Sequence, residues 1–325
     1  MPSSMVRAQL DLFPRDLLPP ATATPSQLAL AAELPKALHL GTSSWTFPGW
    51  EGIVYGKSMT KSRLASDGLA AYAQHPLLTG VGIDRTFYAP LPAETFAAYA
   101  EQVPLGFRFL VKAHEHCTWL RFPMQPRYGA LAGRDNERFL DADYAIREVV
   151  DPMRRGLGAA AGPLVFQFPP QGGLTPQVFA ALLHEFLRAL PSGPEYAVEI
   201  RTARWLTPDY AKALSEGGGV HCFTVHPSMP SIAEQRRLVD AAGAGVVVRW
   251  MLGGDQKYEA ALERYSPFNR IVDEDRDNRR AIAALCAEAL DAGKGAFVTV
   301  NNKAEGSAPL SVFALANAIR EEQSR

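Results

Sequence analysis

Charged side chains fall near the ends of several short apolar segments of this sequence. Glu199 and Arg201 lie two residues apart in the segment Tyr196–Arg201, and Arg249 lies in a similar segment, Gly245–Trp250. Successive side chains of a strand point to opposite faces, so residues two apart share a face. A carboxylate among cations is suited to proton transfer or to orienting a substrate, and the cations are suited to binding an anion.

The same alternation places polar residues of other segments on one common face. In each segment the apolar residues are expected to pack against helices, which leaves the polar residues on the opposite face. The polar-face residues outside the two segments above are Lys112, Gln167, Thr299, Asn301 and Asp84, the last sharing its face with Gly82 and Thr86.

Together these side chains predict one ligand site. Three cations face two carboxylates, and the excess favours a small phosphorylated or carboxylated molecule. The catalytic candidates are Glu199 as acid or base, Asp84 and Lys112. The ligand-binding candidates are Arg201, Arg249, Gln167, Asn301, Asn302, Trp45 and Tyr88. The structural alternative is a closed hydrogen-bonded network inside a barrel, without a ligand.

The elements that must position this site alternate regularly. The expected strands are Leu38–Ser43, Val81–Asp84, Phe107–Lys112, Pro163–Phe168, Tyr196–Arg201, Val220–Val225, Gly245–Trp250 and Ala296–Asn301. The expected helices are Ser62–His75, Ala93–Gln102, Glu137–Arg155, Thr175–Leu190, Pro208–Glu216, Ser231–Ala242, Arg276–Ala292 and Ser311–Glu322. Eight strand–helix pairs predict an α/β fold, a single (β/α)8 TIM barrel, and its chemistry is expected at the C-terminal ends of the strands.

The chain is expected to have two parts. Residues 1–37 are rich in Pro, Ala, Ser and Thr and are predicted to be an N-terminal extension, partly disordered or packed on the barrel. Residues 38–325 are predicted to be the barrel domain. The two long connections, 113–134 and 251–275, leave the C-terminal ends of strands, where long loops are usually functional.

Composition narrows the function classes. The formal net charge of the 325 residues is −1, which argues against a general nucleic-acid binder. Three distant cysteines without a Cys-x-x-Cys pair suit a reducing cytoplasm. The sequence contains neither a signal-peptide pattern nor an apolar run long enough for a membrane span, so we expect no membrane partner. No cofactor motif is recognised.

Three weaker features lie after strand ends. His114 and His116 are spaced to share a metal, but no third ligand is evident, so we expect no metal. The aromatic residues could stack on a base or sugar or simply pack the loops; they are Trp45, Trp50, Phe87, Tyr88 and Trp119. The loop Asn301–Pro309 leads into a helix and resembles a phosphate cradle.

The chain resembles the YecE-like family, domain of unknown function seventy-two, from about Leu40 to about Ile319. The stretches that carry the resemblance are Gly41-Thr42-Ser43-Ser44-Trp45 with Trp50, Arg85-Thr86-Phe87-Tyr88, Val111-Lys112-Ala113, Phe166-Gln167-Phe168-Pro169-Pro170, Val198-Glu199-Ile200-Arg201 with Trp205, Val248-Arg249, and Asn301-Asn302 followed by Gly306 and Ala308-Pro309. The resemblance implies a TIM barrel of unassigned activity.

Three positions depart from the family pattern. Gly82 stands where a glutamate is common, and Trp119 and Thr202 stand where histidines are common. The loss of one carboxylate and two histidines argues against transferring an acid–base mechanism from the family. The sequence therefore leaves three hypotheses: an enzyme acting on a small anion, a nucleic-acid or nucleotide-binding barrel, and a non-catalytic binding or interaction module.

Overall fold

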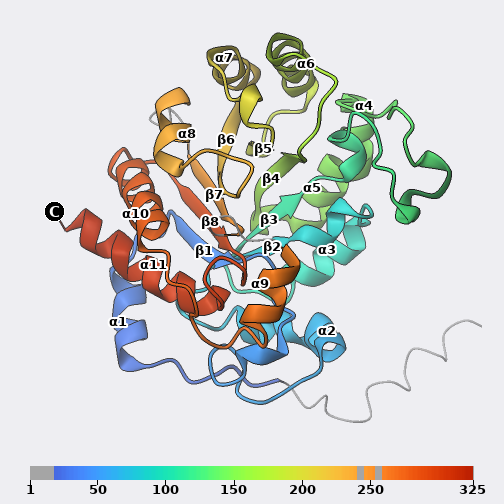
Figure 1. Cartoon of the computed structure of the whole chain (residues 1–325). Coiled ribbons are helices and arrows are strands. Elements are labelled where there is room, and N and C mark those ends of the chain that lie inside the picture. The colour runs from blue at the N-terminus through green and yellow to red at the C-terminus, as the bar shows by residue number, and fades with distance from the viewer. Residues whose placement is uncertain (1–17, 240–244, 253–257, 325) are drawn as a thin grey trace, which may run out of the picture.

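Eight parallel strands close into a barrel in the order β1 to β8 in this computed structural model, which describes residues 18–239, 245–252 and 258–324. The strands are β1 (Leu38–Thr42), β2 (Gly80–Ile83), β3 (Arg108–Lys112), β4 (Ala161–Phe168), β5 (Tyr196–Ile200), β6 (Gly219–Val225), β7 (Val246–Trp250) and β8 (Ala296–Val300). Each strand pairs in parallel with its sequence neighbours, and β1 pairs with β8 (Figure 1). The predicted TIM barrel is confirmed.

Helices surround the barrel (Figure 1). They are α1 (Pro25–Glu33), α2 (Lys61–Tyr72), α3 (Ala93–Ala100), α4 (Ala142–Ala145), α5 (Asp151–Leu157), α6 (Pro176–Ala189), α7 (Pro208–Gly217), α8 (Ile232–Leu238), α9 (Tyr258–Tyr265), α10 (Arg276–Asp291) and α11 (Ala308–Gln323). Threonine caps begin α6 and α7, where Thr175 and Thr207 accept hydrogen bonds from the third residue of each helix.

The helix expected over Glu137–Arg155 differs most from the prediction. It begins at Ala142, where Asp141 accepts a hydrogen bond from the Tyr144 amide, and a π-helical turn over Ile146–Val150 divides it. Pro152 follows this turn, and a proline lacks the N–H that a regular helix needs there. The helices α1 and α9 were not predicted, and residues 240–242 of the expected Ser231–Ala242 helix lie outside the described residues.

The barrel interior changes from apolar to polar at one level. One cluster of buried side chains fills its middle: Leu110, Val165, Ala197, Cys222, Val247 and Phe297. Two residues further along each strand, the inward side chain is polar: Lys112, Gln167, Glu199, Thr224, Arg249 and Thr299. The alternate residues, among them Val198 and Val248, belong to the separate core under the helices. The inward face predicted for Lys112, Gln167, Glu199, Arg249 and Thr299 is therefore the one observed.

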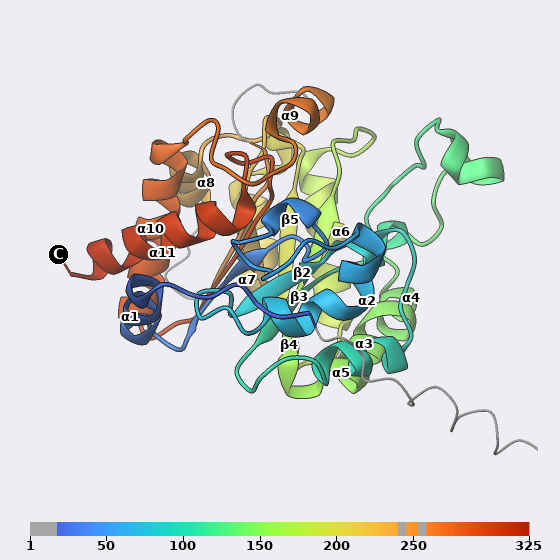
Figure 2. The ribbon, with the colours of Figure 1, turned by 90° about the horizontal axis from the view of Figure 1, so that it is seen from below.

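The N-terminal segment packs along the outside of the barrel from residue 18 onward. Leu18 and Leu30 are buried in the core under the helices, and α1 lies beside α11 in both views (Figures 1 and 2). Pro20 forms an isolated bridge with Tyr55 in the connection after β1. Residues 1–17 of the expected extension lie outside the described residues.

The two long connections stand at the same end of the molecule (Figure 2). The connection after β3 includes a 3-10 turn, Pro126–Leu131. The connection after β7 contains α9, whose Ala261 and Tyr265 pack against Leu252 and Phe268. Residues 253–257 of this connection are not described.

Glycine is required where β1 and β2 approach each other. A Cβ on Gly41 would lie 1.8 Å from the carbonyl oxygen of Gly80. No side-chain rotation relieves a clash with backbone, so we expect Gly41→Ala to lower the free energy of unfolding by about 1–3 kcal/mol or more. Urea denaturation measures the change. The control is Gly172→Ala, because the nearest atom to its added Cβ lies 3.9 Å away; equal effects in both variants would contradict the close approach.

Candidate functional site

Four charged side chains form a chain of ion pairs across the C-terminal end of the barrel. Arg249 on β7 donates from Nη1 to Glu199 Oε2 at 2.5 Å. Its Nη2 lies 2.8 and 2.9 Å from the two carboxylate oxygens of Asp84. Arg201 donates from Nε to the other oxygen of Glu199 at 2.7 Å. The structure therefore brings together four of the predicted site residues, from β5, β7 and the segments that directly follow β2 and β5.

Burial makes this pairing obligatory. The Glu199 side chain is 0% exposed and that of Arg249 is 1% exposed. Burial alone would raise the pKa of Glu199, but Arg201, Arg249 and Lys112 hold it well below its usual range. Burial would likewise lower the pKa of Arg249, and Asp84 and Glu199 raise it instead. Both groups therefore remain charged.

Glu199 has little capacity left for a substrate. Both of its carboxylate oxygens are occupied by guanidinium groups, and Thr224 Oγ1 lies 3.4 Å from Oε1. A carboxylate with a depressed pKa and no exposed oxygen is a weak proton acceptor. This geometry favours a positioning role for Glu199 over the predicted acid–base role.

Lys112 stands apart from the ion pairs. Its side chain is buried, and its Nζ lies 3.5 Å from the centre of the Phe87 ring. Nζ makes no hydrogen bond or ion pair with any residue that the structure describes. Burial is the main cause that lowers the pKa of Lys112 to about 7; Arg249 and Arg201 lower it further, while Asp84 and Glu199 oppose them. At neutral pH a large fraction of this amine is uncharged.

Several polar groups at the mouth lack a partner. Arg201 Nη2, Arg249 Nε and Thr299 Oγ1 are buried and make no hydrogen bond within the described residues. The buried amide of Gln167, which is paired in register with Glu199, makes none with described residues either. Buried polar groups are normally hydrogen-bonded, so unpaired donors gathered at one place indicate a place for an acceptor.

Asp84 reaches the site from the turn that directly follows its strand. The strand β2 ends at Ile83, and a 3-10 turn over Asp84–Phe87 follows. The Asp84 side chain is 31% exposed, so it borders solvent as well as Arg249. The predicted shared face of Asp84 and Thr86 is wrong, because the turn redirects Thr86 to within 2.5 Å of the Lys112 carbonyl oxygen.

Sequence reasoning missed His226, which follows β6. The Ser228 amide donates to its Nδ1 at 3.2 Å, so a neutral ring carries its proton on Nε2. Burial lowers the pKa of His226 to about 4, and Arg201 and Arg249 contribute, with Glu199 opposing them. Because these three side chains influence its pKa, the neutral His226 imidazole lies near the ion pairs. No spacing motif marks this residue, but its position two residues beyond the inward Thr224 was a usable signal.

Two predicted ligand-binding residues are structural. Trp45 is buried in the core under the helices, where its ring meets Tyr99 edge-on at 5.3 Å. Asn302 is buried, and its Oδ1 accepts hydrogen bonds from Trp50 Nε1 at 3.2 Å and from the Ala308 amide at 2.8 Å. Both positions were predicted from their place after a strand, but their side chains turn into the protein.

The expected phosphate cradle is closed for the same reason. Residues 302–309 are buried, and a Cβ on Gly306 would lie 2.7 Å from the Arg270 carbonyl oxygen. The side chain of Asn302 already occupies the N-terminus of α11. The start of α11 at Ala308, three residues before the predicted start, follows from Pro309 in its first turn.

Asn301 and Tyr88 remain at or near the mouth. Asn301 Oδ1 accepts from the Lys303 amide at 3.0 Å, and its Nδ2 lies 3.5 Å from Ser43 Oγ. The Tyr88 side chain is 64% exposed, with the Arg127 guanidinium 5.1 Å from its ring centre. Asn301 can still orient a ligand, whereas Tyr88 lies on the outer rim.

The two histidines after β3 contact each other through tilted rings. The rings of His114 and His116 lie 4.5 Å apart, and His114 Nδ1 is 2.7 Å from the Tyr144 hydroxyl. Among the described residues, no group of three or more His, Cys, Asp or Glu side chains is placed to hold a metal ion. No helix in the described part of the chain has the length and hydropathy of a membrane span.

Two of the three positions that depart from the family pattern, Gly82 and Thr202, have structural roles here. A Cβ on Gly82 would lie 3.1 Å from the Ser43 carbonyl oxygen, so a larger residue needs a shift of the loop after β1. Thr202 Oγ1 accepts from the Gln171 amide at 3.1 Å, which joins the loops after β4 and β5. The indole nitrogen of Trp119 is buried without a hydrogen bond to described residues.

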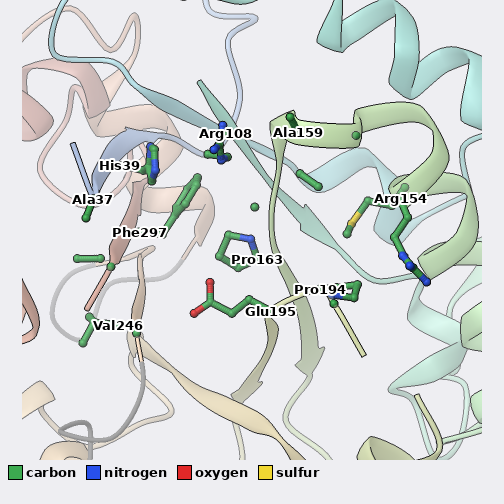
Figure 3. Close-up of a pocket in the computed structure, with 18 residues that line it drawn as sticks. Ala37, His39, Arg108, Arg154, Ala159, Pro163, Pro194, Glu195, Val246 and Phe297 are labelled. Atoms are coloured by element: carbon green, nitrogen blue, oxygen red, sulfur yellow. The ribbon is translucent and has the colours of Figure 1, made fainter. Parts of the chain in front are cut away.

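A separate cavity of about 700 Å³ opens at the N-terminal end of the barrel (Figure 3). His39, Arg108 and Glu195 are its ionisable lining near the strand starts. Phe297 lines it too and fills the barrel interior above, where a Cβ on Gly80 would lie 2.7 Å from its ring. None of the predicted site residues borders this cavity, so it is distinct from the polar mouth.

The buried ion pairs generate a prediction about stability. Glu199→Gln keeps the side-chain shape but leaves Arg201 without a carboxylate and Arg249 with Asp84 alone, and loss of one partner of a buried pair costs about 3–5 kcal/mol. Because the pKa of Glu199 is below its unfolded value, the stabilisation is present above the ordinary carboxylate range and is lost as pH falls through and below it. Denaturation between about pH 7 and pH 3 should therefore show a weaker pH dependence in the variant than in the wild type.

The control for this measurement is Glu185→Gln, because the Glu185 side chain is 81% exposed. It should leave both the unfolding free energy and its pH dependence nearly unchanged. If Glu199→Gln behaved like this control, the ion-pair chain would not hold the folded barrel.

Comparisons with known proteins agree with this fold. Crystal structures of DUF72 family proteins are similar to it: one from Enterococcus faecalis V583 has a TM-score of 0.59 at 17% identity and covers 87% of this chain and 95% of its own. One from Thermotoga maritima MSB8 has a TM-score of 0.56 at 18% identity, with coverage of 86% and 98%. Among curated proteins, none matches. The family model "Protein of unknown function DUF72" matches residues 39–325. The chain therefore belongs to the DUF72 family.

Proposed function

We propose that this protein is an enzyme that binds a small phosphorylated or carboxylated molecule at the C-terminal mouth of its barrel. The observation that carries the proposal is the set of unpaired donors there. Arg201 Nη2 and Arg249 Nε are buried without an acceptor, although charge-assisted hydrogen bonds are the strongest that these groups form. An anionic oxygen would supply the missing acceptor.

Arg201 is the best candidate for direct contact with the anion. Its side chain is 15% exposed and uses only Nε on Glu199. Arg249 is held on both sides by Asp84 and Glu199 and therefore orients the site rather than contacting the ligand with its Nη atoms. The two arginines balance the two carboxylates, and the unpaired donors on Arg201 and Arg249 support an anionic rather than a cationic ligand.

Proton transfer is best assigned to Lys112 and His226. An amine with a pKa of about 7 is balanced between base and acid at neutral pH, the condition that favours general catalysis. The neutral His226 ring has a donor on Nε2 for a substrate oxygen. In this proposal Glu199 and Asp84 position the arginines instead of accepting protons.

The nucleotide-binding alternative has less support. Of the five aromatic side chains considered for stacking, Trp45, Trp50 and Phe87 are buried. A buried ring has no free face for a base, and stacking is the sequence-tolerant part of nucleic-acid binding. Retained ligand binding without turnover of any tested anion would instead favour the non-catalytic binding module.

Arg201→Gln tests anion binding. We expect phosphorylated or carboxylated metabolites to raise the melting temperature of the wild type, because a ligand at about a hundred times its Kd stabilises by about 2.7 kcal/mol. In Arg201→Gln most of this shift should disappear. Arg204→Gln, an exposed arginine on the same loop, is the control and should keep the full shift. A shift equal in all three proteins, or absent from the wild type throughout a broad panel, would refute the proposed site.

Lys112→Met separates a functional from a structural lysine. The pKa of Lys112 is about 7 when folded and about 10.4 when unfolded, so the burial cost of its charge is largest below pH 7 and falls as pH rises above it. Methionine has similar length and no charge, so the variant should melt at a higher temperature than the wild type at pH 6, while turnover is lost. A lower melting temperature would indicate that Lys112 stabilises the fold instead.

A further inference from the structure

We propose that the Lys112 amine forms an imine with the carbonyl carbon of a small oxo acid; this inference rests on the anion site proposed above. The carboxylate of the oxo acid would pair with Arg201, and its carbonyl group would lie against Lys112. The substrate class is therefore narrower than a general anion: a molecule that has a carbonyl group next to a carboxylate.

The arginines occupy the carboxylates that could pair with Lys112. Asp84 and Glu199 are the carboxylates near enough to influence Lys112 electrostatically. Arg249 binds both oxygens of Asp84 and one of Glu199, and Arg201 binds the other. A lysine that served to balance charge would itself contact one of these carboxylates. This amine is left without one among the described residues.

The surroundings of the Lys112 amine decide between its charged and neutral forms. The guanidinium groups of Arg201 and Arg249 lie near enough to Lys112 to disfavour a third positive charge there. The Phe87 ring, 3.5 Å from Nζ, attracts an ammonium through its face and excludes water on that side. Burial and the two guanidinium groups outweigh this attraction and favour the neutral amine, whose lone pair is the nucleophile in imine formation.

The reaction balances without a cofactor. The Nζ lone pair forms a bond to the carbonyl carbon, and the π electrons move to oxygen, which takes up a proton as nitrogen loses one. The resulting carbinolamine loses its hydroxyl group, with a second proton, as water. Amine and carbonyl compound thus give imine and water, with no oxidant or reductant. The neutral ring of His226, whose pKa responds to Arg201 and Arg249, has an N–H donor on Nε2 for the leaving oxygen.

Trapping with borohydride tests the imine on the whole protein. The protein is incubated with glyoxylate or pyruvate at pH 7, reduced with sodium cyanoborohydride, and analysed by intact mass and peptide mapping. An ordinary lysine of pKa about 10.4 is almost fully protonated at pH 7, so we expect labelling of Lys112 to exceed that of exposed lysines at least about tenfold. The rate of labelling should rise as pH increases through about 7.

Two variants complete the test. Lys112→Arg should abolish the dominant adduct, and Lys212→Arg, which removes an exposed lysine, should not change it. Labelling spread evenly over exposed lysines, or a wild type with Lys112 unmodified, would overturn the imine. The melting temperature measured with the same oxo acids, without reductant, distinguishes failure of the imine from failure of the anion site. Stabilisation that depends on Arg201 but leaves Lys112 unmodified would refute the imine and keep the anion site; neither stabilisation nor adduct across oxo acids and the wider panel would refute both.

Discussion

The Arg249 guanidinium, buried between Glu199 and Asp84, is the interaction on which the rest of the site depends. It joins the ends of β2, β5 and β7 through hydrogen bonds of 2.5 to 2.9 Å. A buried charge is costly unless it is paired. Removal of one of these three side chains would therefore leave a remaining buried charge with fewer partners. Because Arg249 and Arg201 saturate the carboxylates, Lys112 is left as the unpaired amine.

The polar level of the barrel rests on an apolar one. Below it, Leu110, Val165 and the other inward side chains pack the barrel interior, and Phe297 fills the lower end. Such a floor excludes water and lowers the local dielectric, which strengthens each charge interaction above it. The same environment explains why the pKa values of Glu199, Lys112 and His226 all fall, each by a different balance of burial and neighbouring charge.

Much of this architecture was predictable from the sequence, and the wrong predictions of site residues share one cause. The eight strands and the inward direction of Lys112, Gln167, Glu199 and Arg249 follow from a period of two, which is a local property of the sequence. Predictions failed after the strands end. Trp45, Thr86 and Asn302 were assigned from position, but a turn that follows a strand can direct a side chain either way. His226 was missed because no motif marks it, although it lies two residues beyond the inward Thr224.

The sequence by itself determined the closed barrel, the face of each strand and the gathering of charges at one end, because alternation and the exclusion of water from apolar faces act along the chain. The tertiary structure decided which charge pairs with which. Asp84 and Arg249 are 165 residues apart, and no spacing rule connects them. Barrel closure brings them into contact, and the distances and burial in that contact determine which groups are saturated and which remain free for chemistry.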